Sequence, residues 1–297
     1  MQVAKWIADT KAMHRHGLTI LELMVSLAIV SLVMALTLPA LGSARESARR
    51  LQCVNHLREL GLGSQNHHSA LNQLPIGWQH DLAKRSAFGW AVPLLPYLEQ
   101  TNVYVDRRNS IDSQSNQSAR QTSLEMMLCP SDIAEVSFFL FEEHDDSSSL
   151  PLPRLAGIAG SPAVLMELPT ANYVGVFGTL DPDISIPAPR GNGAFEENIA
   201  HRFSDFQRGL SNTVLVGERT MAQVPSTWFG VILAGEDAAA RLVGAALQGI
   251  NNPQADECDF SSRHPGGANF LWADGHVSFV SAQIELTQYH TMTKLSD

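Results

Sequence analysis

A single carboxylate inside a long apolar segment is the first feature of this sequence that could do chemistry. Between Leu18 and Leu38, Glu22 is the one acidic or basic residue among side chains that are mostly Leu, Val, Ile, Met and Ala. A carboxylate at the centre of a bilayer costs on the order of 2.5 to 3.5 kcal/mol on insertion scales, so it persists because something pairs with it. We therefore expect Glu22 to need a partner that a single chain in lipid does not supply.

A second chemical pattern lies near the C-terminus, where His264 is followed after nine residues by Asp274 and Gly275. An imidazole and a carboxylate could act in acid-base or metal chemistry, but no third ligand or nucleophile is identifiable. Alternating apolar runs flank Asp274-Gly275, and an Asp-Gly pair is typical of a two-residue type I′ hairpin turn, in which both residues have positive φ. We predict a hairpin here rather than a catalytic site.

The spacing of the remaining candidate residues does not match a known metal-binding or redox motif. The three cysteines allow at most one intramolecular disulfide and include no Cys-x-x-Cys pair: Cys53, Cys129 and Cys258. The acidic runs at 142–149 and 181–183 lack the spacing and central glycine of an EF-hand loop. Three histidines fit a polar helix face and a frayed terminus: His56, His67 and His68. We therefore expect no metal, no cofactor and no enzymatic activity.

The element that carries Glu22 is long enough to cross a membrane. Leu18 to Leu38 is a run of roughly 20 mostly apolar residues, which spans a hydrocarbon core as a helix. A secretory signal peptide cleaved after Ala40-Leu41-Gly42 is the alternative, but its apolar region usually holds only about 7 to 15 residues and lacks an acid. We expect a transmembrane helix over 18–39, in which Pro39 kinks or loosens the end of the span.

The sequence Gly17-Leu18-Thr19-Ile20-Leu21-Glu22 resembles the cleavage and methylation site of type IV prepilins and pseudopilins. The resemblance implies that a prepilin peptidase cuts between Gly17 and Leu18 and methylates the amine of Leu18, which replaces the family phenylalanine. It further implies that residues 1–17 are a cytoplasmic leader and that Glu22 is the fifth residue of the mature chain. The amine of a neighbouring pilin-like subunit would then offset the Glu22 carboxylate in the inner membrane.

The rest of the chain predicts a helix followed by a sheet. Apolar residues at three and four spacing over 40–72 indicate an amphipathic continuation of the helix, whose end Gly61 and Gly63 would loosen. Residues 73–297 would form the exported globular domain. Strand patterns occur at 136–141, 171–177, 212–216, 228–233 and 268–280, and an alanine-rich run at 238–250 indicates a helix. We predict an α+β fold with a mostly antiparallel sheet.

Several motifs together resemble the DUF1559 family of bacterial pilin-like proteins, which has no established activity. They are Gln52 to Leu57, Leu94 to Gln100, Cys129-Pro130-Ser131-Asp132, Asn172-Tyr173-Val174-Gly175, Gly191 to Phe195, Ser211-Asn212-Thr213, Gly217-Glu218-Arg219, and His264 with Asp274-Gly275. Arg208-Gly209-Leu210 departs from the Asp-Gly-Thr expected before Ser211. In an exported domain, either Cys53 and Cys129 form a disulfide that pins the helix to the domain, or the cysteines stay reduced and buried.

Two classes of function remain open. The first is a membrane-anchored pilin-like structural subunit of a type II secretion or type IV pilus-like assembly, with its C-terminal domain in the periplasm or outside. The second is a helix-tethered binding module that holds an extracellular ligand near Trp78, Trp90, Trp228 and Trp272. The net charge of −10 argues against nonspecific binding to nucleic acid.

Overall fold

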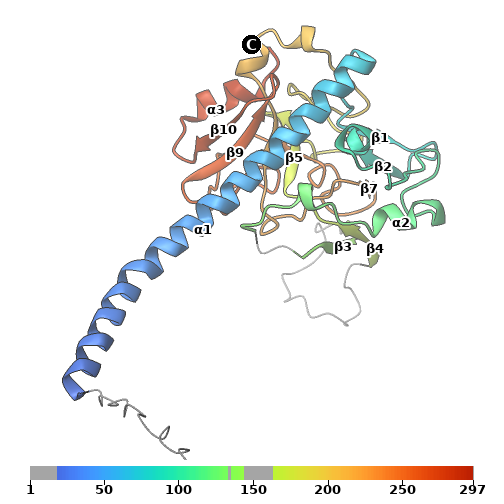
Figure 1. The fold of residues 1–297 in the computed structure, drawn as a ribbon. Helices are drawn as coiled ribbons and strands as arrows, with labels where there is room; N and C mark the ends of the chain where they lie inside the picture. Colours follow the sequence, from blue (N-terminus) through green and yellow to red (C-terminus); the bar gives the residue numbers. More distant parts are fainter. Residues whose placement is uncertain (1–18, 133–134, 144–162, 297) are drawn as a thin grey trace, which may run out of the picture. The chain divides into compact units, whose positions relative to one another are not determined.

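The computed structural model describes residues 19–132, 135–143 and 163–296 (Figure 1). The predicted cleavage residues Gly17 and Leu18 lie outside these ranges, as does most of the acidic run at 142–149. The described chain divides after Ser47 into two units. One helix, α1 (Ile20–Leu71), contributes to both.

The first unit contains the apolar part of α1, whose large side chains are exposed. Leu21, Leu27 and Leu32 are 60 to 72% exposed, as suits a surface that faces lipid. Ser26 and Ser31 donate hydrogen bonds to the carbonyl oxygens of Leu23 and Ala28, both at 2.9 Å, so the helix itself satisfies their hydroxyl groups. Among the described residues, α1 is the one helix long and apolar enough to span a membrane.

The second unit contains an α+β domain, which confirms the predicted fold class. A five-stranded sheet has the order β10-β9-β6-β5-β8, and every neighbouring pair is antiparallel except β5 and β8. Its strands are β5 (Tyr173–Gly178), β6 (Val214–Glu218), β8 (Val243–Ala245), β9 (Gly267–Trp272) and β10 (Val277–Ser281).

Smaller elements complete this unit. β1 (Trp78–His80), β2 (Ser86–Gly89) and β7 (Gly230–Ile232) form a three-stranded antiparallel sheet, and β3 (Ser137–Phe141) pairs with β4 (Val164–Pro169). The described residues of this unit also form two short α-helices, α2 (Gln117–Arg120) and α3 (Leu286–Thr293).

The C-terminal part of α1, from Cys53 onward, packs into the domain instead of loosening. The buried stripe of this part includes Cys53, Leu57, Leu60 and His67, whereas Leu51, which belongs to the apolar three and four spacing over 40–72, is 57% exposed. The prediction that the two glycines loosen the helix end was wrong, because the helix continues to Leu71. A Cβ on Gly61 would lie 2.8 Å from Leu271, and one on Gly63 would lie 2.6 Å from Leu98. These glycines therefore allow close packing of the helix.

The alanine-rich run at 238–250 is not a helix, so this prediction was also wrong. The segment makes turns around the short strand β8, which pairs in parallel with β5. A Cβ on Gly244 would lie 2.9 Å from the ring of Phe260, and Gly249 has a φ of +120°. Pairing with the sheet overrides the helix propensity of alanine here.

The predicted hairpin at the C-terminal motif forms, but its turn differs from type I′. Trp272 N–H donates to the carbonyl oxygen of His276, and Gly275 N–H donates to that of Trp272, both at 2.9 Å. Three residues therefore form the loop, and of Asp274 and Gly275 only Gly275 has a positive φ, +92°. This pattern matches a type I turn followed by a glycine bulge.

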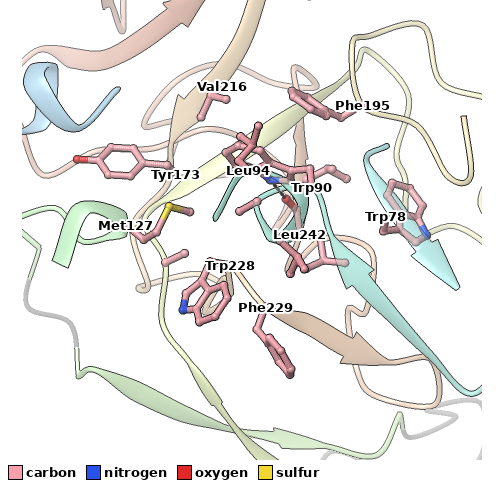
Figure 2. Packing of buried hydrophobic residues seen from close by; sticks show 14 of the residues in the cluster. Trp78, Trp90, Leu94, Met127, Tyr173, Phe195, Val216, Trp228, Phe229 and Leu242 are labelled. Carbon is pink, nitrogen blue, oxygen red and sulfur yellow. Dashed lines mark hydrogen bonds between the residues drawn. The ribbon is translucent and has the colours of Figure 1, made fainter. Parts of the chain in front are cut away.

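The aromatic core lies beside the five-stranded sheet (Figure 2). Trp90 and Trp228 are each 1% exposed, and the indole N–H of Trp90 donates a 3.0 Å hydrogen bond to the carbonyl oxygen of Leu242. Trp78 is 2% exposed and packs against Phe177. Three of the four tryptophans named for the ligand-binding alternative are thus core residues and form no exposed aromatic platform.

Candidate functional site

Glu22 takes part in a capping box at the start of α1. Its Oε2 accepts hydrogen bonds from the backbone N–H and the hydroxyl of Thr19, both at 2.9 Å. In return, Glu22 N–H donates to Thr19 Oγ1 at 3.3 Å. This Thr-x-x-Glu arrangement gives the carboxylate polar partners within its own chain, a local role that the sequence analysis missed. Neutral donors do not cancel its charge, so the cost of placing it in lipid remains.

A second site is a buried cluster of four metal-ligating side chains inside the domain, which we call the Cys-His-Glu cluster: Cys53, Cys129, Glu218 and His264. One ligand atom from each lies within 4.8 Å of the others. The Sγ atoms of Cys53 and Cys129 are 3.0 Å apart, and His264 Nε2 lies 3.7 Å from Cys129 Sγ and 3.5 Å from a Glu218 carboxylate oxygen. None of the four residues is more than 7% exposed.

Elements far apart in the sequence deliver these four residues. Cys53 comes from α1, Cys129 from the loop after residues 125–127, Glu218 from the end of β6, and His264 from the loop before β9. Each residue belongs to a different one of the motifs that carry the family resemblance. Spacing along the chain could not reveal the group, because Cys53 and Cys129 are 76 positions apart and Cys129 and His264 are 135 positions apart.

Hydrogen bonds hold the cluster in place. Asn269 donates from its backbone N–H and its side-chain amide to the two carboxylate oxygens of Glu218, both at 2.8 Å. Asn172 Oδ1 accepts from Cys129 N–H at 2.8 Å, while its amide donates to Asp132 at 2.7 Å and to the carbonyl oxygen of Arg219 at 3.1 Å. Asn172 therefore ties the Cys129 loop to the β6 end that carries Glu218.

The two thiols of the cluster differ in acidity. The hydrogen bond from Cys53 lowers the pKa of Cys129 to about 6, with burial opposing this shift and His264 adding to it. The same hydrogen bond, together with burial, raises the pKa of Cys53. Burial likewise raises the pKa of Tyr173, whose hydroxyl lies next to the Cys53 thiol. Cys129 is therefore the thiol that ionises first.

The disulfide predicted between Cys53 and Cys129 would join two residues of the Cys-His-Glu cluster. Their sulfur atoms lie 3.0 Å apart as free thiols, compared with about 2.05 Å in a disulfide. The covalent bond stays a prediction.

The structure does not bring the two polar residues of the C-terminal motif together. Asp274 pairs with His276 at 2.6 Å, whereas His264 belongs to the Cys-His-Glu cluster. His56 lies 3.1 Å from the carbonyl oxygen of Leu128, His67 lies 2.9 Å from that of Gln73, and His68 stacks on Phe203. The acidic run at 181–183 contributes Asp181 to a second, less buried group with Asp256 and Cys258.

Comparison with known families gives two matches. Residues 12–38 match the prokaryotic N-terminal methylation motif, which supports a pilin- or pseudopilin-type protein that a prepilin peptidase processes. Residues 42–287 match the family described as "Protein of unknown function (DUF1559)". No curated protein and no solved structure matches the chain. Because the second match covers most of the sequence, the chain belongs to the DUF1559 family.

Proposed function

We propose that this protein is a membrane-anchored, pilin-like structural subunit of a type II secretion or type IV pilus-like assembly. The observation that carries the proposal is the N-terminal methylation motif beside the exposed apolar segment 18–38, in which Glu22 is the one acidic residue. In the assembly, the methylated amine of Leu18 in one subunit neutralises the Glu22 carboxylate of a neighbour. The leader stays in the cytoplasm, and the domain lies in the periplasm or outside.

The proposed role is structural and not enzymatic. The Cys-His-Glu cluster is almost closed to solvent, so a substrate has no direct access to it. The binding alternative loses most of its aromatic surface, because Trp78, Trp90 and Trp228 support the core. Both observations favour a domain whose buried residues serve its own architecture.

Three substitutions separate the charge of Glu22 from its capping role. Glu22→Gln removes the charge but keeps an amide that can complete the capping box. Glu22→Ala removes both, and Thr19→Ala removes only the hydroxyl part of the box. We expect copurification with other pilin-like subunits after crosslinking in membranes to fall at least about tenfold for both Glu22 variants, because the interaction that is lost exceeds about 1.4 kcal/mol.

Ser26→Ala is the matched control, since it removes another polar group from the same apolar helix. The proposal predicts that Thr19→Ala and Ser26→Ala still copurify with the other subunits. Full copurification of Glu22→Gln together with loss in Thr19→Ala would contradict charge pairing and show that helix capping is what the assembly requires.

A further inference from the structure

We propose that the Cys-His-Glu cluster is a structural zinc site in which Cys53, Cys129, His264 and Glu218 bind one Zn²⁺. The donor set fits this ion, because Zn²⁺ binds thiolate, imidazole and carboxylate groups in four-coordinate sites. The proposal goes beyond the assembly role and does not depend on it.

The distances within the cluster suit a common ion. Ligand atoms that surround one Zn²⁺ at bond lengths of about 2.0 to 2.3 Å lie roughly 3.3 to 3.8 Å from one another. The Cys129–His264 and His264–Glu218 distances of 3.7 and 3.5 Å fall in this range. The 3.0 Å between the two sulfur atoms is shorter, so these atoms would move apart by less than about 1 Å on binding, and all four ligand atoms lie within 4.8 Å of one another.

The surroundings of the cluster also favour an ion over a disulfide. A disulfide would use the two sulfur atoms and give no reason for a buried carboxylate and a buried imidazole to converge on them. Asn269 holds both oxygens of Glu218 from the side, as outer-shell groups do around metal ligands.

The site would act as a crosslink. All four ligands come from the protein, which is typical of structural rather than catalytic zinc. It would join α1 to the Cys129 loop, the end of β6 and the loop before β9, so metal binding would stabilise the folded domain. Because the thiols lose their protons on binding, zinc and a disulfide exclude each other at this position.

The test uses the full-length protein purified in detergent under reducing conditions. We expect the wild type to retain about one zinc per chain by elemental mass spectrometry. After metal removal, we expect added Co²⁺ to give thiolate-to-cobalt charge-transfer absorption. Cys53→Ser, Cys129→Ser and His264→Ala should each weaken binding by more than about 100-fold, since losing a ligand exceeds the 10–100-fold loss of an outer-shell partner.

Cys258→Ser is the matched control, because Cys258 is an equally buried thiol outside the cluster. It should keep both the zinc and the cobalt spectrum. The wild type decides the matter even where a variant fails to fold. No bound zinc and no thiolate–cobalt band in the reduced wild type would overturn the proposal, as would a Cys53–Cys129 disulfide found by mass spectrometry in protein alkylated directly in cells.

Discussion

Replacing Arg219 by Ala is expected to lower the free energy of unfolding by about 3 to 4 kcal/mol, because it removes a buried hub of hydrogen bonds and leaves a cavity. Arg219 is 1% exposed, and burial lowers its pKa to about 10. Its guanidinium donates to Ser226 Oγ at 2.8 and 3.0 Å and to the carbonyl oxygens of Val243, Glu257 and Ala240. Alanine would remove this donor from three buried acceptors, in Ser226, Val243 and Ala240, and from the part-buried carbonyl oxygen of Glu257.

Urea unfolding of the detergent-solubilised chain, followed by the fluorescence of the buried tryptophans, measures this loss. Arg85→Ala is the control, since Arg85 is 65% exposed and its ion pair with Asp112 spans 3.6 Å. Such a surface pair contributes about 0 to 1 kcal/mol. Equal losses in the two variants would show that the Arg219 network does not support the fold.

Replacing Gly217 by Ala is expected to cost about 2 to 3 kcal/mol of unfolding free energy, because the site has no room for a methyl group. An added Cβ would lie 2.6 Å from Phe270 and still closer to Phe260. Both rings are fully buried and pack edge to face, so neither can move without opening the core.

The same urea titration tests this prediction, with Gly42→Ala as the control. No atom lies within 4 Å of the position that a Cβ on Gly42 would take, and alanine favours the helix there. A stability for Gly217→Ala equal to that of the wild type would mean that the two phenylalanines adapt and that packing around β6 is looser than described.

Local patterns allowed the long helix and most of the sheet to be predicted from the sequence. Glu22 stands out because the residues around it are apolar, and the strands β6 and β9 show apolar runs of the right length. The alanine-rich segment around β8 misled the prediction, since its parallel pairing with β5 depends on residues more than 60 positions away. The hairpin turn was assigned to the wrong type because Asp-Gly suits more than one turn.

The Cys-His-Glu cluster could not be predicted from spacing. Its four residues come from four separate motifs, and only the folded sheet brings Glu218 and His264 beside the two cysteines. The signal available in the sequence was that each residue lies in a motif shared with the family resemblance. Some motif residues, such as Glu218, have no evident role in the local turn or strand. The fold should therefore be checked for whether such residues lie close together.

The amino terminus of the mature protein in the membrane fraction tests the central claim most directly, because the pilin-like role requires Glu22 to stay close to a free, processed amine. Tandem mass spectrometry of the intact chain is expected to find Leu18 as the first residue, carrying one added methyl group. A chain that begins at Ser43 would have lost Glu22 and the whole apolar helix to a signal peptidase, and would contradict the account.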